Sequence, residues 1–305
     1  MTVPMIYRWD DADAPILAGQ TDSFCALLQS CLVDGYTNRD GAGWTVAYRN
    51  QAGGEISLRT AGANARYYAV AHNTSTNTQK SATVTLYETM SAVNVGINGT
   101  PVEYVYLSST TSALGRPWMI IADAYGAYIF VANSATTLTS QQFWDFFGYF
   151  GEGIPALAGD NYFQVLGLGL SASVGSQCGM IGGVNAPSAS SRMDVLRNGL
   201  GVVGAAMCQC LGAGQPSPVS GAAGLVGSPY PWNGNQTIIG RLAVSDDTAY
   251  SFRGWLPGLY YPCHNSPFEN FTQIEEGGKT LMAQKVKIST SNGQVLIDIS
   301  AGFRP

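Results

Sequence analysis

The sequence predicts a mainly β fold with a few helices, in which β-sandwich or barrel-like sheets accompany an N-terminal amphipathic helix at about residues 22–34. Three observations lead to this fold class. Short apolar runs alternate with polar turn signals along most of the 305 residues. An Asn-Gly pair between two apolar runs near the C-terminus indicates a hairpin. A clear helical period occurs near the N-terminus.

The N-terminal helix is predicted by its apolar spacing. Residues 21–23 (Thr-Asp-Ser) supply candidate N-caps, and Gly35 is a suitable C-terminal stop. Between them, apolar side chains recur at i, i+3, i+4, i+7 and i+8, which places them on one face of a helix. These candidate core residues are Phe24, Leu27, Leu28, Cys31 and Leu32.

A second helix is expected from Thr139 or Ser140 to Gly148, with three phenylalanines on one face. The remaining elements are predicted as strands separated by Gly-, Asn- and Asp-rich turns. We expect strands at residues 44–49, 55–59, 66–71, 82–87, 102–107, 118–122, 127–131, 280–289 and 294–299. Asn292-Gly293 is expected to form the turn of the last hairpin.

The composition changes in the middle of the chain, which suggests two domains. We predict a mixed β/helix domain at residues 1–158 and a Gly-rich, charge-poor β domain with a C-terminal hairpin at residues 159–305, although a single domain is also compatible with this length. Between Asn161 and Gly240 only Arg192, Asp194 and Arg197 are charged. Because interface cores are depleted of charge, this segment is expected to be covered by its own chain or by neighbouring subunits.

The overall composition excludes several classes of protein. Charged residues make up only 11% of the chain, and 15 Lys+Arg against 20 Asp+Glu give a net charge of −5. This balance argues against nucleic acid as a partner. The uncharged Gly-rich run is interrupted by Gln209 and by prolines after Gly214, so we expect no membrane span. The first residues lack the pattern of a secretory signal, and we expect the six cysteines to be reduced.

No motif predicts catalysis, and we expect no catalytic residue, cofactor or metal. The glycine pattern at residues 199–204 lacks the acidic residue that a dinucleotide site needs about 20 positions later. His72 is expected at the surface in a turn, and the adjacent Cys263 and His264 point to opposite faces of an extended chain. Cys208 and Cys210 lack the paired spacing of structural zinc sites. The adjacent carboxylates at residues 10–11, 246–247 and 275–276 single out no hydrolase pair.

Two aromatic-rich segments, residues 230–232 and 255–262, are typical of rigid loops that dock on a partner, although such loops also pack on their own domain. The candidate interface residues in them are Trp232, Trp255, Leu259, Tyr260 and Tyr261.

Several motifs resemble a family of virion structural proteins of tailed bacteriophages. The resemblance begins with Tyr7-Arg8-Trp9-Asp10-Asp11, Ala14-Pro15, Cys31-Leu32-Val33, Gly35-Tyr36 and Gly41-Ala42-Gly43-Trp44. It continues with Tyr87-Glu88-Thr89-Met90, Arg116-Pro117-Trp118, Phe146-Phe147-Gly148, Leu256-Pro257-Gly258-Leu259-Tyr260 with Pro262, His264 and Pro267, and Gln294-Val295-Leu296-Ile297-Asp298-Ile299. The Gly-rich middle carries little of it, and Cys263 stands where the pattern has a bulky aliphatic residue.

The resemblance implies a particle component without an assigned activity, made in the bacterial cytoplasm and located in the virion. We expect a tail or baseplate protein that contacts other virion proteins and itself, with capsid decoration or the collar as alternative locations. A receptor- or glycan-binding module at the tail tip is a second hypothesis, and exposed tryptophans would favour it. A cell-wall hydrolase is a third, which clearing of peptidoglycan in a zymogram would reveal.

Overall fold

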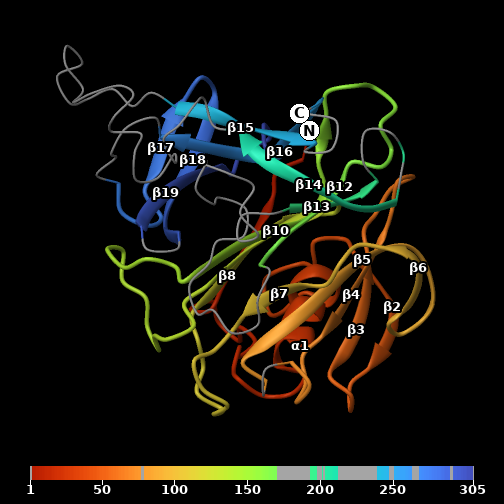
Figure 1. Cartoon of the computed structure of the whole chain (residues 1–305). Helices are drawn as coiled ribbons and strands as arrows, with labels where there is room; N and C mark the ends of the chain where they lie inside the picture. Colours follow the sequence, from red (N-terminus) through yellow and green to blue (C-terminus); the bar gives the residue numbers. More distant parts are fainter. Residues whose placement is uncertain are drawn as a thin grey trace.

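The computed structural model describes residues 2–76, 79–169, 193–197, 201, 203–211, 239–246, 251–262, 268–288 and 291–304 (Figure 1). It confirms the mainly β fold class, with antiparallel sheets and one short helical segment. Trp232, Cys178, Cys263, His264 and most of the uncharged middle lie outside the described residues.

The predicted N-terminal helix is confirmed as α1 (Ser23–Gln29), which continues as one π-helical segment, η1 (Ser30–Asp34). The five residues of the predicted apolar stripe are all buried in one core. Gly35 ends the segment with a φ of 78°, where a β-carbon would lie 2.3 Å from the carbonyl oxygen of Arg39. A residue with a side chain is therefore excluded from this position without a backbone shift.

The smaller sheet contains most of the strands of the N-terminal half. Its strand order is β2-β3-β4-β5-β6, and β7 pairs with the first part of β5. The strands are β2 (Thr45–Asn50), β3 (Glu55–Arg59), β4 (Tyr67–Ala71), β5 (Ser81–Ala92), β6 (Val95–Gly99) and β7 (Glu103–Tyr106).

The larger sheet has the order β1-β8-β9-β10-β12-β13-β14-β15-β16-β19-β18-β17, with β11 added beside β16. The N-terminal members are β1 (Met5–Arg8), β8 (Trp118–Asp123), β9 (Gly126–Val131) and β10 (Phe146–Glu152). The others are β11 (Ile154–Pro155), β12 (Gln164–Gly167), β13 (Met193–Arg197), β14 (Val203–Leu211), β15 (Ile239–Asp246), β16 (Ser251–Pro262), β17 (Gln273–Glu276), β18 (Lys279–Ile288) and β19 (Ser291–Asp298). Strands that precede and strands that follow the predicted boundary near Gly159 thus belong to one sheet. That the two segments fold separately stays a prediction.

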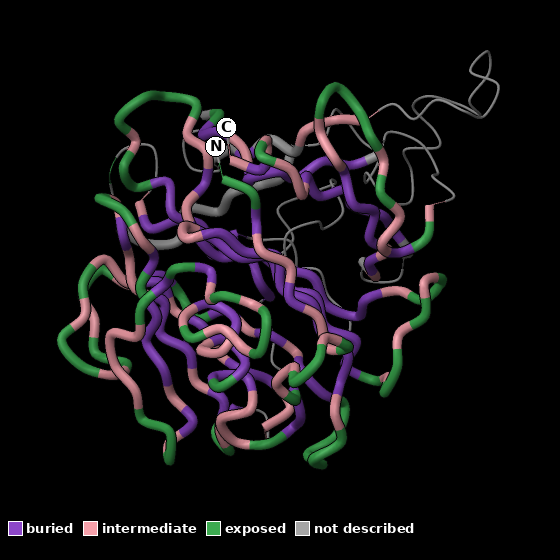
Figure 2. The backbone as a smooth tube through the Cα atoms, turned by 180° about the vertical axis from the view of Figure 1, so that it is seen from behind, coloured by how far each residue is buried: buried purple, intermediate pink, exposed green. Residues whose placement is uncertain are grey.

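Strands β8, β9 and β10 lie between two apolar cores, which explains their nearly continuous burial (Figure 2). Trp118 and Ile120 belong to the core that contains α1 and the smaller sheet. Met119 and Ile121 belong to the second core, which the rest of the larger sheet surrounds. Successive side chains of a strand point to opposite faces, so a strand covered on both faces must be apolar at every position.

The helix predicted at residues 139–148 is wrong, because this segment leads into β10. Phe146 faces the first core and Phe147 the second, which is the period of a strand and not of a helix. Just before β10, Trp144 forms a parallel bridge to Val286 of β18. Its N–H donates to the carbonyl of Lys285 at 2.9 Å, and its carbonyl accepts from the N–H of Lys287 at 2.8 Å. The larger sheet thereby folds back on itself around the second core.

Two further turn predictions are corrected. Asn292 and Gly293 lie within β19, because its pairing with β18 extends from Leu281–Asp298 to Ile288–Ser291. Residues 255–262 form most of strand β16 and not a loop, and this strand lies between β15 and β19. Within the described residues, no helix is both long enough and apolar enough to cross a membrane.

Candidate functional site

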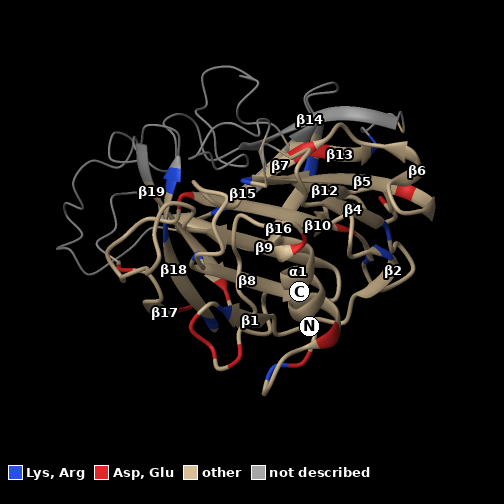
Figure 3. Ribbon diagram, turned by 90° about the horizontal axis from the view of Figure 1, so that it is seen from below, with Lys and Arg blue, Asp and Glu red and all other residues tan. Residues whose placement is uncertain are grey.

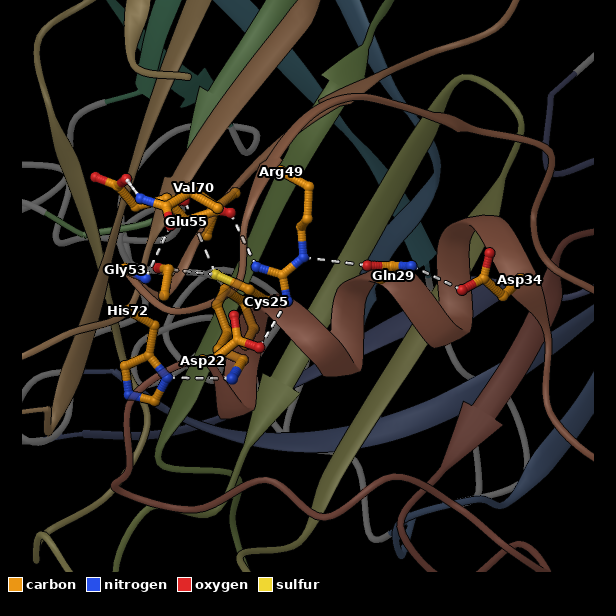
Figure 4. Close-up of polar contacts among 12 residues, drawn as sticks. Asp22, Cys25, Gln29, Asp34, Arg49, Gly53, Glu55, Val70 and His72 are labelled. Carbon is orange, nitrogen blue, oxygen red and sulfur yellow. Dashed lines mark hydrogen bonds and ion pairs between the residues drawn. The ribbon is translucent and has the colours of Figure 1, made fainter. Parts of the chain in front are cut away.

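A polar cluster at the start of α1 brings together the residue types that catalysis most often uses. We define this helix-start cluster by Asp22, Cys25, Arg49, Glu55 and His72 (Figure 4). Three elements supply it: the helix, the β2–β3 hairpin and the end of β4. A cysteine, a histidine and a carboxylate in one place could form a nucleophilic site, so the partners of each group decide its chemistry.

His72 is buried, which corrects the expectation of a surface position. Its Nδ1 accepts a hydrogen bond from the backbone N–H of Phe24 at 3.1 Å. Since an amide N–H can only donate, the ring proton must be on Nε2, which donates to the carbonyl of Gln79 at 2.9 Å. The imidazole therefore caps the first turn of α1 from 48 residues away along the chain. Burial lowers the pKa of His72 below its ordinary value of 6.5, so the ring is neutral at pH 7.

Cys25 is held as a neutral thiol. Its Sγ–H donates to the carbonyl of Gly54, with 3.3 Å between sulfur and oxygen. Burial, and then the negative charge of Asp22, raise the pKa of Cys25 to about 12. Only a thiolate attacks carbonyl carbons or binds metals effectively, so Cys25 is not an activated nucleophile. Burial likewise raises the pKa of Cys31 well above its ordinary value.

Arg49 joins the three elements of the helix-start cluster. Its Nη2 donates to Asp22 at 2.6 Å, its Nη1 to the carbonyl of Glu55 at 2.9 Å, and its Nε to the side-chain oxygen of Gln29 at 3.2 Å. In Figure 4 its guanidinium lies between the helix and the hairpin. The imidazole, thiol and guanidinium of the cluster thus connect elements of secondary structure.

The neutral state of His72 gives the protein a specific acid sensitivity. As pH falls below 6.5, the unfolded chain binds a proton on His72 more readily than the folded chain, so the free energy of unfolding decreases. We expect His72→Gln to cost about 1–3 kcal/mol at pH 7.5, because the N–H of Phe24 loses its acceptor. We also expect the variant to lose part of the decline between pH 6.5 and 5.

Urea unfolding followed by circular dichroism over that pH range tests this prediction. The pKa of Glu88 is lower in the folded protein than its ordinary value of 4.5. Protonation of Glu88 therefore decreases the free energy of unfolding only below pH 4.5, and measurements above pH 5 avoid its contribution. Parallel pH profiles for wild type and His72→Gln would contradict the role given to the imidazole.

The remaining sequence candidates form no site in the described part of the chain. There, no group of three or more His, Cys, Asp or Glu side chains could hold a metal. Asp10 pairs with Arg8, and Asp11 accepts from Tyr36 and pairs with Arg39, which are structural contacts. The glycine pattern at residues 199–204 runs into strand β14, whereas a dinucleotide site needs a helix there. The side chains of Cys208 and Cys210 lie outside the description.

Sequence reasoning missed a buried carboxylate that joins the two sheets. Glu103 of β7 accepts from the backbone N–H of Leu168, beside β12, and from that of Asp194 in β13. The N–H of Tyr104 donates to the carbonyl of Gly169 next to it, at 2.6 Å. A charged residue inside the otherwise uncharged strand predicted at residues 102–107 was the available signal, because a buried charge requires specific partners.

Most of the predicted interface residues pack inside the protein. Leu259, Tyr260 and Tyr261 are buried in the cores beside β16, which corrects their assignment to a docking loop. The physical reason is that this part of β16 lies between two cores: Leu259 and Tyr261 belong to the second core, and Tyr260 belongs to a smaller third one. Trp255 is half-buried and keeps some exposed surface, whereas Trp232 lies outside the described residues.

Around Trp255 lies a largely aromatic and aliphatic surface with one arginine, which we call the Trp255 patch: Leu157, Arg241, Phe252 and Trp255. The ring of Phe252 meets that of Trp255 edge-to-face at 4.8 Å, and the guanidinium of Arg241 lies 4.9 Å from the indole. The N–H of Ala156 donates to the carbonyl of Arg253, which brings Leu157 beside the start of β16. Leu157 is 75% exposed and Phe252 is 47% exposed.

Charged groups also lie beside the patch, because Arg253 of β16 pairs with Asp160 at 2.8 Å. Over the ribbon as a whole, Figure 3 shows charged residues only in short, separated stretches. No family model matches the chain, and no curated protein was found to be similar to it.

Proposed function

We propose that the chain is a structural component of a tailed-bacteriophage virion, located in the tail or baseplate, which assembles through protein–protein contacts and has no catalytic role. The observation that carries the proposal is the Trp255 patch. Tryptophan and arginine are enriched in interface hot spots, and here they lie against each other beside an exposed phenylalanine. The motifs shared with virion structural proteins give the proposal its biological setting.

The helix-start cluster supports the non-catalytic part of the proposal. Its thiol is protonated, its imidazole is held by two backbone groups, and its arginine is used to join three elements. A catalytic site would instead need an accessible group with a pKa near the working pH.

A sugar-binding role at Trp255 is the weaker candidate. Stacking on a sugar needs an open indole face, whereas the guanidinium of Arg241 and the ring of Phe252 already lie against this side chain. A flat protein surface suits the patch better, because it can cover Phe252 and Leu157 together.

Particle incorporation of surface variants tests the proposal. Phe252→Lys places a charge in the Trp255 patch, and we expect at least about tenfold less of this variant in purified particles, equivalent to about 1.4 kcal/mol of binding. The matched control is Leu114→Lys, which changes another exposed aliphatic residue in a loop and should incorporate like wild type.

Both variants should keep the wild-type melting temperature in solution. Separation of heads from tails before mass spectrometry distinguishes a tail position from decoration of the capsid or a collar position. Equal incorporation of Phe252→Lys and Leu114→Lys would overturn the role of the patch.

A further inference from the structure

The loop between β7 and β8 (residues 107–117) folds around a buried arginine, Arg116. Only 5% of this residue is exposed. Its backbone N–H donates to the carbonyl of Leu17 at 2.8 Å, which anchors the end of the loop. The loop also lies close against Gly19, where a β-carbon would come within 1.9 Å of the carbonyl oxygen of Thr110. The arginine is therefore held in a fixed place beneath a surface loop.

The groups that bind the guanidinium of Arg116 are all uncharged. Its Nε donates to the hydroxyl of Ser108 and its Nη1 to the carbonyl of Ala135, each at 3.1 Å. Its Nη2 donates to the hydroxyls of Ser109 at 3.4 Å and Thr110 at 3.0 Å. None of the ion pairs between described residues includes this arginine. An uncompensated charge is costly to bury, so a buried arginine usually has a negative partner.

The carboxylate of Asp145 is engaged elsewhere, although it contacts the segment that binds Arg116. It accepts from the hydroxyl of Ser134 at 3.1 Å, and Ser134 directly precedes Ala135, whose carbonyl binds the guanidinium. The other oxygen of Asp145 pairs with Lys287. The charge of Asp145 is therefore balanced by Lys287 and not by Arg116.

The hydroxyls around the guanidinium have more protons than the described residues have acceptors for. An arginine N–H can only donate, so each hydroxyl that binds it accepts and keeps its own proton to donate. Thr110 and Ser112 share one bond, with 2.8 Å between their oxygens, which uses a single proton of the two. The hydroxyl protons of Ser108 and Ser109 have no acceptor in the described part of the chain. Residues 109, 110 and 112 are exposed, so this excess of donors lies at the surface.

We propose that this loop binds a small oxyanion of the phosphate type at the hydroxyls of Ser109, Thr110 and Ser112. The anion accepts the unused hydroxyl protons, and the buried guanidinium behind them supplies the opposite charge. Ser109 and Thr110 already accept from the guanidinium, which polarises their own protons toward a further acceptor. A phosphate offers several oxygens, so it can accept from more than one of these positions at once.

The proposal goes beyond the proposed function and does not depend on it. An anion bound to the loop favours the folded chain, in which Arg116 and the hydroxyls are brought together, over the unfolded chain. The anion also lowers the cost of burying the guanidinium. We therefore expect the site to fix the loop between β7 and β8 on the body of the protein.

Isothermal titration calorimetry of the full chain with inorganic phosphate tests the inference. We expect a single saturable site with a Kd of about 1 mM or lower. Sulfate should displace the phosphate, because it also presents several acceptor oxygens. Chloride at the same ionic strength should not displace it, which separates binding at the hydroxyls from screening of charge.

A double variant fixes the position of the site. Ser109→Ala/Ser112→Ala removes two exposed hydroxyls and leaves the guanidinium with Ser108, Thr110 and the carbonyl of Ala135. We expect this variant to melt like wild type without phosphate and to have a Kd for phosphate at least about tenfold higher. The matched control is Thr111→Val, which removes an exposed hydroxyl of the same loop and should bind phosphate like wild type.

The variant Arg116→Gln tests the contribution of the charge, and it should abolish binding while it retains a cooperative melting transition. A wild-type protein that binds no phosphate at about 10 mM, tenfold above the expected Kd, would overturn the inference. A double variant that binds phosphate as well as wild type would overturn it too. Neither result bears on the incorporation of Phe252→Lys into particles, so the two proposals fail separately.

Discussion

Leu28→Asp is expected to prevent folding of the whole chain. Leu28 is fully buried in the core that unites α1, the smaller sheet and strands β8 to β10. An unpaired carboxylate in such a position costs several kcal/mol, which approaches the entire stability of about 5–15 kcal/mol of a folded protein. The variant should appear in the insoluble fraction on expression, and refolded material should lack a cooperative thermal transition by circular dichroism.

Ala26→Asp is the matched control for this prediction. Ala26 lies two residues earlier on α1 and is exposed, so the same carboxylate there should change the free energy of unfolding by about 0.5 kcal/mol at most. Leu28→Ala should fold, but its free energy of unfolding should be lower by about 2–5 kcal/mol. Its stability should therefore lie between those of wild type and Leu28→Asp. A soluble Leu28→Asp protein with wild-type melting would refute the assignment of this core.

Trp144→Ala should destabilise the protein by about 3–5 kcal/mol, because it removes the largest side chain at the closure of the larger sheet. Its indole packs against Phe130 at 5.7 Å and against Trp9 at the same distance. Its Nε1–H donates to the side-chain oxygen of Gln284 at 2.8 Å, and that buried oxygen would lose its partner. Urea unfolding followed by circular dichroism measures the loss.

Trp144→Phe separates packing from hydrogen bonding at the same position. We expect Trp144→Phe to lower the free energy of unfolding clearly less than Trp144→Ala does. Most of the ring contacts remain, and only the hydrogen bond to Gln284 is lost. If Trp144→Ala were as stable as wild type, our conclusion that the larger sheet folds back on itself at Trp144 would be wrong.

Local patterns predicted the parts of the fold that have one buried face. Phe24 to Leu32 follow a helical period because only one side of α1 meets the core. Most strands of the smaller sheet were located for a similar reason, and β3 (Glu55–Arg59) has the predicted bounds. The second half of β5 and all of β6 (Val95–Gly99) were not predicted.

Of the strands covered on both faces, β8 and β9 were predicted, but β10 was predicted as a helix. Phe146 and Phe147 are adjacent because β10 separates two cores, and in isolation such a run resembles a helix face. Likewise, the Pro and Gly residues of β16 suggested a loop, but Gly254 and Gly258 adopt positive φ values within a strand whose register shifts at bulges.

The site predictions failed where contacts between residues far apart in the sequence determine where a side chain lies. His72 follows a strand and precedes polar residues, which suggests a surface turn, yet its partner Phe24 is far away in the sequence. Leu259 to Tyr261 read as docking residues because aromatic and apolar side chains are common in both interfaces and cores. Only the packing of these three side chains into two cores distinguishes the two possibilities.

The number of copies of this chain per purified virion tests the central claim most directly. Quantitative mass spectrometry of gradient-purified particles, with heads and tails separated, measures it. A structural role predicts a fixed copy number in the tail fraction that persists after a high-salt wash. Recovery of the chain only as free protein in the lysate, with none in the particles, would contradict the account.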